Sequence, residues 1–218
     1  MSLHLQRDLD KLKKEVLKLG NLVETAINNG ILALHNRESS YVDEVFKHEA
    51  IINDMEVKIE EDCLKILALH QPVAVDLRFI VVVLKVNNDL ERMGDFATNI
   101  AKRARELMQV DPLQTLPEFV NELPDLVRTM VRKSLDALVK LDLELANEVI
   151  EMDDSVDQIN RDMYAVMKQE ISRNPQNAET AVNLLSCSRY MERIADLSTN
   201  IAEDVIFMVE GRVIRHTD

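Results

Sequence analysis

The sequence contains few of the residues that end helices or build sheets: 4 glycines, 5 prolines, no tryptophan and 4% aromatic residues. Tight turns depend on Gly and Pro, and strands favour aromatic and β-branched residues, so this scarcity argues against a β-rich fold. Leu, Glu, Lys and Ala favour long helices instead. Because 46% of the 218 residues are apolar, the chain can build a continuous core, and we expect an all-α protein.

Cysteines and membrane signals are also scarce. Cys63 and Cys187 lie in apolar helical stretches without the spacing of metal ligands, which predicts buried free thiols in a reducing compartment. The start of the chain, residues 1–10, is polar and charged, unlike a signal peptide. The most apolar run, residues 79–86, is too short to span a membrane and contains Lys85. We therefore expect a cytoplasmic protein without membrane insertion.

Basic residues are outnumbered by acidic ones. The chain has 26 Lys and Arg against 39 Asp and Glu, a formal charge of −13. This balance argues against nucleic-acid binding, which depends on clustered Lys and Arg. The same acidity suits metal ions or a basic partner surface, although it also serves solubility alone.

Apolar residues recur in alternating steps of four and three, a pattern typical of helices in bundles. We predict six long helices, at about residues 5–35, 41–69, 71–110, 124–140, 142–173 and 174–211. Gln71-Pro72 and Asn174-Pro175 each resemble a helix N-cap followed by a first-turn proline. Asp142 can cap the fifth helix, and Gly211 is a plausible residue to follow the last one.

The six helices form two sets of three with matching sequences. Residues 91–101, ERMGDFATNIA, recur at 192–202 as ERIADLSTNIA with seven of eleven positions identical, an offset of 101 residues. Upstream the offset is 104, which fits a different loop length before the last helix of each set. We predict two tandem three-helix bundles: an N-terminal repeat at 1–110, a proline-containing linker at 111–123 and a C-terminal repeat at 124–218.

Both copies stack acidic side chains on one helix face. The Glu and the Asp of each copy are four residues apart and so lie on adjacent turns of the same face. Similar ladders occur on the second helix of each set, and if the ladders face each other, each repeat gathers four oxygen-bearing side chains. The candidate metal ligands are Glu49, Asn53, Glu91 and Asp95 in the N-terminal repeat and Asp153, Asp157, Glu192 and Asp196 in the C-terminal repeat.

Such all-oxygen sites suit hard cations such as Mg²⁺, Mn²⁺ or Ca²⁺, and iron also fits. Stacked carboxylates repel each other and need a counter-charge. Arg92 and Arg193 point roughly 100° away around their helices, so we do not expect them to supply it. Because Asn53 replaces an acid, the C-terminal repeat is expected to hold the better site.

Other interpretations of these acids stay open. They are also explained as the solvated faces of amphipathic helices, which would make the chain a structural helical adaptor. A metal-dependent hydrolase is a further alternative, in which the bound ions activate water. Neither Glu91 nor Glu192 is followed by His three residues on, unlike the bundle di-iron sites. The sequence shows no nucleophile–base pair and no Gly-rich phosphate loop, so we do not expect an enzyme.

At these positions the chain resembles the PhoU family of phosphate-signalling proteins. The resemblance extends from about residue 5 to 211. Its motifs are Gln71-Pro72-x-x-x-Asp76-Leu77-Arg78, Leu90-Glu91-Arg92-x-Gly94-Asp95 and Met191-Glu192-Arg193-x-x-Asp196. The departures are Asn53 in place of an acid and Ala195 opposite Gly94, the second of which we interpret as a packing variation.

The resemblance implies an all-helical cytoplasmic protein, usually a homodimer, that restrains phosphate uptake and phosphate-regulon signalling. It implies two partners, the ATPase subunit of a phosphate ABC transporter and a membrane histidine kinase. It also implies that the paired acids bind metal ions. Such a regulator acts by binding its partners differently in two states.

Overall fold

The computed structural model describes residues 3–113 and 119–212, and within them the long elements are six α-helices with no strand. The helices are α1 (Leu3–Asn36), α2 (Ser39–His70), α3 (Ala74–Leu107), α4 (Phe119–Lys140), α5 (Leu143–Arg173) and α6 (Ala178–Glu210). A short 3₁₀ turn, η1 (Pro175–Asn177), precedes α6. The predicted all-α fold of two three-helix bundles is therefore confirmed.

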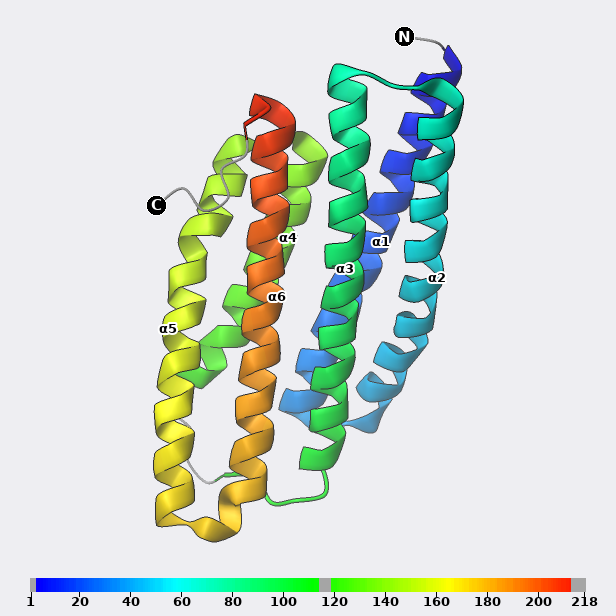
Figure 1. Ribbon diagram of the computed structural model, residues 1–218. Coiled ribbons are helices and arrows are strands. Elements are labelled where there is room, and N and C mark those ends of the chain that lie inside the picture. Colours follow the sequence, from blue (N-terminus) through cyan, green and yellow to red (C-terminus); the bar gives the residue numbers. More distant parts are fainter. Residues whose placement is uncertain (1–2, 114–118, 213–218) are drawn as a thin grey trace.

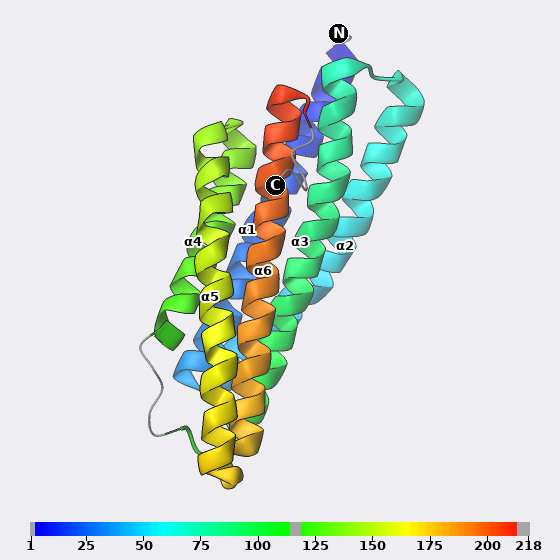
Figure 2. The ribbon, with the colours of Figure 1, turned by 60° about the vertical axis from the view of Figure 1, so that its left-hand side comes forward.

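The two bundles lie side by side with their helix axes roughly aligned. In Figure 1, α1–α3 occupy the right half and α4–α6 the left half, with α3 and α6 adjacent at the centre. The helices α5, α6, α3 and α2 form a front layer, and α1 and α4 lie behind it; Figure 2 shows the same arrangement from the side. Because α3 runs downward and α6 upward, the two central helices are antiparallel.

The apolar stripes face one shared core. In α1 the apolar residues that recur in steps of four and three, from Leu5 to Gly30, are all buried. Ile52, Ile59 and Ile66 follow one another at steps of seven along α2, and all three are buried. A single cluster of buried side chains connects both bundles. The periodicity of the sequence therefore predicted the core-facing sides of the helices correctly.

The predicted start of α3 was wrong. Gln71 does not cap α3 but ends α2: its φ and ψ of 46° and 55° are left-handed, and its N–H donates to the carbonyl of Leu67. Val73, in an extended conformation, is the residue before α3. The residue before a proline is disfavoured in the right-handed helical region, so Pro72 breaks the helix at Gln71, and α3 begins at Ala74, three residues later than predicted.

The start of α4 also differs from the prediction, because the helix already includes Phe119 and Pro124 lies inside it. Leu123 and Val127 are both buried, so packing holds helical turns on either side of the proline. Part of the predicted linker, residues 114–118, lies outside the described residues. The boundary predicted at residue 124 consequently falls within a helix.

Two of the predicted helix ends are confirmed. The Oδ1 of Asp142 accepts hydrogen bonds from the backbone N–H groups of Glu144 (3.0 Å) and Leu145 (3.2 Å), which is N-capping geometry. Gly211 follows α6 with a φ of 71°. Asn174 does not cap α6, because the proline after it begins the 3₁₀ turn and its side chain bonds Glu170 instead.

Gly94 and Ala195 occupy equivalent positions in the two repeats. The side chain that faces the smaller residue, Gly94, is larger than its counterpart in the other repeat. A Cβ added to Gly94 would lie 3.1 Å from the Cδ1 of Ile52. At the offset of 104, the position of Ile52 is taken by the smaller Val156, in the repeat that has Ala195. The larger Ile52 thus occurs with Gly94, and the smaller Val156 occurs with Ala195. Packing therefore explains why the two motifs differ at this position.

Candidate functional site

The C-terminal acidic ladder forms a cluster between α5 and α6. Asp157 of α5 and Glu192 and Asp196 of α6 each present a carboxylate oxygen, and these oxygens lie within 4.8 Å of one another. Helix α5 packs along α6, so residues four apart on α6 face one position of α5. Three of the four predicted C-terminal ligands are therefore brought to one point.

Asp153, the fourth predicted ligand, lies one turn earlier on α5, outside this group of three. Burial, together with the neighbouring carboxylates of Asp196 and Asp157, raises the pKa of its carboxyl from 3.8 to about 6. The pKa values of Glu192 and Asp196 are also raised, in both cases chiefly by burial. The surroundings of Asp153, Glu192 and Asp196 thus disfavour the negative charges of these three carboxyl groups.

Glu192 is the most informative residue of the cluster. Only 9% of its side chain is exposed, and its Oε2 accepts no hydrogen bond within the part of the chain that the structure describes. Burying a carboxylate oxygen without a partner is costly, whereas a cation would satisfy it. The buried oxygen and the all-oxygen donor set both fit a hard metal ion.

Arginines around the cluster supply more counter-charge than the sequence predicted. Arg189 donates to the Oε1 of Glu192. Arg193 places its Nη1 3.6 Å from the Oδ2 of Asp196 and its Nε 4.0 Å from the Oε2 of Glu192. Arg161 donates to Asp157 at 3.3 Å. The expectation that Arg193 points away from the acids was wrong, because its long side chain bends back across the helix surface.

The N-terminal ladder is not gathered in the same way. Among the described residues, Glu49, Glu91 and Asp95 do not form a group of converging carboxylates, and Asn53 adds no charge. Burial raises the pKa of Glu91, and the carboxylates of Asp95 and Glu56 raise it further. Glu56 therefore belongs to this surface.

Glu56 was not identified from the sequence, although Glu56 and its equivalent in the other repeat both lie at a contact between the second and third helices. The buried Asn87 of α3 donates to the backbone carbonyl of Glu56 at 2.9 Å. At the equivalent positions of the C-terminal repeat, Ser188 donates to Asn160 at 2.8 Å. The same two positions therefore join the second and third helices in both repeats, and they place Glu56 one turn from Asn53.

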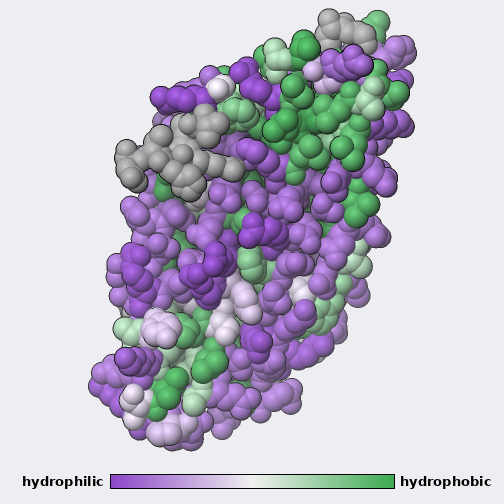
Figure 3. All heavy atoms as spheres, viewed as in Figure 1, coloured by the Kyte–Doolittle hydropathy of each residue, from purple (hydrophilic) through white to green (hydrophobic). Residues whose placement is uncertain are grey.

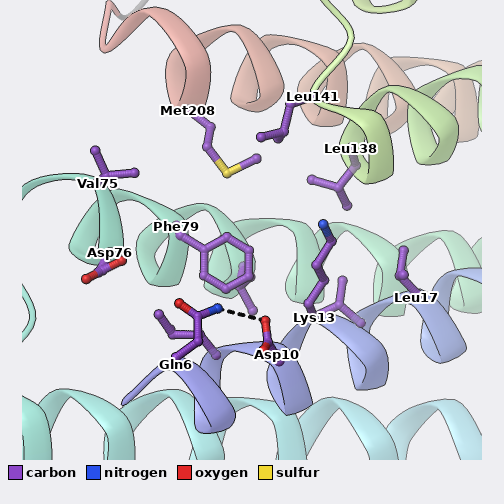
Figure 4. Close-up of a pocket in the computed structure, with 13 residues that line it drawn as sticks. Gln6, Asp10, Lys13, Leu17, Val75, Asp76, Phe79, Leu138, Leu141 and Met208 are labelled. Atoms are coloured by element: carbon purple, nitrogen blue, oxygen red, sulfur yellow. Dashed lines mark hydrogen bonds between the residues drawn. The ribbon is translucent and has the colours of Figure 1, made fainter. Parts of the chain in front are cut away.

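A separate cavity of about 240 Å³ lies between the two bundles, at the N-terminal ends of α1 and α3. Figure 4 shows Phe79 of α3, Met208 of α6 and Leu138 of α4 around it. Lys13 also borders it, and Gln6 donates to Asp10 at 2.9 Å on its rim. Its walls are mostly apolar, so it does not resemble the acidic cluster.

The face formed by α5, α6, α3 and α2 is mainly polar in its middle, as Figure 3 shows. Apolar side chains gather where α2 ends and α3 begins, including Leu69, Val73 and Val75, which are 65%, 74% and 61% exposed. Within the described residues, no helix is both long and apolar enough to cross a membrane.

Comparisons with known proteins agree with the repeats and the fold. The family model described as the PhoU domain matches twice, at residues 16–104 and 120–205. The phosphate-specific transport system accessory protein PhoU homolog of Aquifex aeolicus is 36% identical, covering 96% of this chain and 95% of its own. The homolog of the same description from Pseudomonas putida is 35% identical, covering 96% and 82%.

Two solved structures are similar over nearly their whole length. The crystal structure of PhoU from Pseudomonas aeruginosa has a TM-score of 0.92 and 33% identity, covering 95% of this chain and 99% of that one. The phosphate transport system regulatory protein PhoU from Streptococcus pneumoniae has a TM-score of 0.84 and 27% identity, covering 96% and 99%. Both likenesses extend over both helical bundles.

Proposed function

Because this chain belongs to the PhoU family, we propose that it regulates phosphate transport and phosphate-regulon signalling from the cytoplasmic side of the membrane. The observation that carries the proposal is the match to relatives named accessory proteins of the phosphate-specific transport system, over 96% of this chain. The same two-bundle fold in a structure named as a phosphate transport regulatory protein supports it.

The proposed mode of action is binding, with no reaction catalysed. The partners are the ATPase subunit of a phosphate ABC transporter and a membrane histidine kinase, and the chain acts as a homodimer. A regulator of this kind changes transport only if it binds its partner more tightly in one state than in another. The names of the relatives, accessory and regulatory protein, support this mode.

The acidic cluster supplies the proposed metal site. Asp157, Glu192 and Asp196 would hold the ion, with Asp153 one turn away. A bound hard cation supplies positive charge that offsets the repulsion among these carboxylates. Since the carboxylates come from both α5 and α6, they connect the two helices and can transmit the state of the site along the bundle.

A binding experiment tests the proposal. The purified chain, immobilised at one end, is exposed to the transporter's ATPase subunit and separately to the cytoplasmic part of the kinase, each with Mn²⁺ and with chelator. We expect saturable binding to at least one partner. Absence of binding to both partners, under both conditions, would overturn the proposed function. Glu192→Gln should reduce any binding that depends on the metal ion. The substitution Glu179→Gln, at an exposed position on the same helix, serves as its control.

A further inference from the structure

Two guanidinium groups converge on one buried carboxylate in the acidic cluster. Arg189 donates to the Oε1 of Glu192, and the Nε of Arg193 lies 4.0 Å from the Oε2 of the same side chain. Arg193 also reaches Asp196, with 3.6 Å between the charged atoms. The central helix of the other repeat adds Arg92, which lowers the pKa of Asp196 against the stronger raising effect of burial.

Arg189 bonds the Oε1 of Glu192, and Arg193 lies near the Oε2 of Glu192 and the Oδ2 of Asp196, so both arginines are placed beside oxygens that a cation would need. The Arg189 and Arg193 side chains are 50% and 46% exposed, whereas the Glu192 side chain is 9% exposed. Exposed ion pairs contribute little net stability, so a divalent ion competes well against them. When the carboxylates bind a cation instead, the guanidinium groups lose their partners while staying anchored on the same turns of α6.

The N-terminal repeat lacks this arrangement. The positions equivalent to Arg189 and Arg161 are Asn88 and Val57, and Arg92 lies 3.9 Å from Asp89 of its own helix. The concentration of arginines is therefore specific to the repeat in which the carboxylates converge. General solubility does not require such a difference between the two repeats.

We propose that Arg189 and Arg193 form a binding site for a phosphate-like oxyanion, which opens when a cation takes over the carboxylates that these arginines pair with. This inference rests on the proposed metal site. A guanidinium group presents a planar fork of N–H donors that matches two oxygens of a phosphate. The two guanidinium groups are one turn apart on α6. Together they present enough N–H donors to bind a doubly charged oxyanion beside the cluster.

The two ligands are coupled by charge. Without a cation, Asp157, Glu192 and Asp196 neutralise the arginines and repel an anion. With a cation, that repulsion falls and the arginines are released, so the oxyanion binds more tightly. Linkage requires the reverse as well: the oxyanion raises the affinity for the cation by the same factor. The site would thus report cation and oxyanion together.

Calorimetric titrations of the chelator-treated chain test the inference. The cation (Mg²⁺, Mn²⁺ or Ca²⁺) is titrated first, and inorganic phosphate is then titrated with and without the best-binding ion. We expect phosphate affinity to rise at least tenfold with the ion. In Arg189→Gln/Arg193→Gln this rise should disappear, while affinity for the ion alone increases several-fold because its competitors are gone. Exposed Arg132→Gln on α4 is the control and should resemble wild type.

The possible results distinguish a failure of the proposed metal site from a failure of the proposed oxyanion site. If no ion binds, both the metal site and this inference are wrong. If the ion binds but phosphate affinity is unchanged by it, or if the double variant retains the coupling, only the oxyanion site is wrong. A parallel titration with AMP distinguishes the sources of the phosphate group: tightening with AMP assigns phosphate esters to the site, and tightening with phosphate alone assigns the free ion.

Discussion

Lys85 of α3 donates a hydrogen bond to Asp204 of α6, with 2.9 Å between Nζ and Oδ1. Asp204 is only 1% exposed, and the ammonium group also lies 5.3 Å from the centre of the Phe207 ring. The pair joins the two repeats across the central helix contact. It also explains why the most apolar run of the sequence, residues 79–86, is interrupted by a lysine.

Replacing Lys85 should therefore destabilise the junction between the repeats. Lys85→Met removes the ammonium partner of the buried Asp204 carboxylate, and we expect the free energy of unfolding to fall by about 2 kcal/mol, since a buried acceptor that loses a hydrogen-bond partner is costly. Urea denaturation measures the loss. Lys85→Met/Asp204→Leu should recover part of it, and a double variant less stable than the single one would contradict this account.

The contact between Gly94 and Ile52 predicts a coupling between two substitutions. Gly94→Ala gains about 0.5–1 kcal/mol of helix propensity but crowds Ile52, and such overpacking costs about 1–3 kcal/mol. We expect the single change to be neutral or destabilising. In an Ile52→Val background, which reproduces the C-terminal pair, the same change should be stabilising. Equal effects of Gly94→Ala in both backgrounds, measured by urea denaturation, would show that the contact is unimportant.

The raised pKa of Asp153 predicts how the metal-free chain responds to pH. Because the folded-state pKa, about 6, lies above the ordinary value of 3.8, the neutral carboxyl favours folding. Its stabilising contribution is complete below pH 3.8 and is lost as the pH rises through about 6. Thermal melting in the presence of chelator should show wild type losing stability across this range relative to Asp153→Asn. An unchanged difference between the two proteins would contradict the assignment.

The two cysteines should react slowly with alkylating agents. Burial raises the pKa of both the Cys63 and the Cys187 thiol to about 12, so few thiolates exist at neutral pH. We expect modification of the folded chain by iodoacetamide to be at least tenfold slower than that of the urea-unfolded chain. Rapid modification under native conditions would indicate that the helices around these residues open often.

Much of the fold was predictable because the apolar residues of a long helix recur at a regular spacing on the side that packs against the core. The stripe from Leu5 to Gly30 and the Asp142 cap depend on local periodicity and local hydrogen bonds. The break at Gln71 was harder to place, since the same Gln-Pro pair can end one helix or begin the next. Pro72 disfavours a right-handed helical conformation at Gln71, and the chain resumes a helix only after the extended Val73.

The candidate site was predictable to a lesser degree. Spacing identified the acids of each ladder, but it did not show that Asp157, Glu192 and Asp196 converge while the N-terminal residues do not. That difference depends on how neighbouring helices lie against each other. The position of Arg193 was predicted wrongly, because the direction of its Cα–Cβ bond does not determine where a long side chain ends.

The most direct test of the metal site is a calorimetric titration of the chelator-treated chain with Mn²⁺ in four forms: wild type, Glu192→Gln, Glu91→Gln and the control Glu179→Gln. We predict that Glu192→Gln weakens the tightest site at least tenfold, whereas Glu91→Gln and Glu179→Gln leave that site unchanged. Identical titrations of wild type and Glu192→Gln, or no binding by wild type, would contradict the assignment of this cluster to a metal ion.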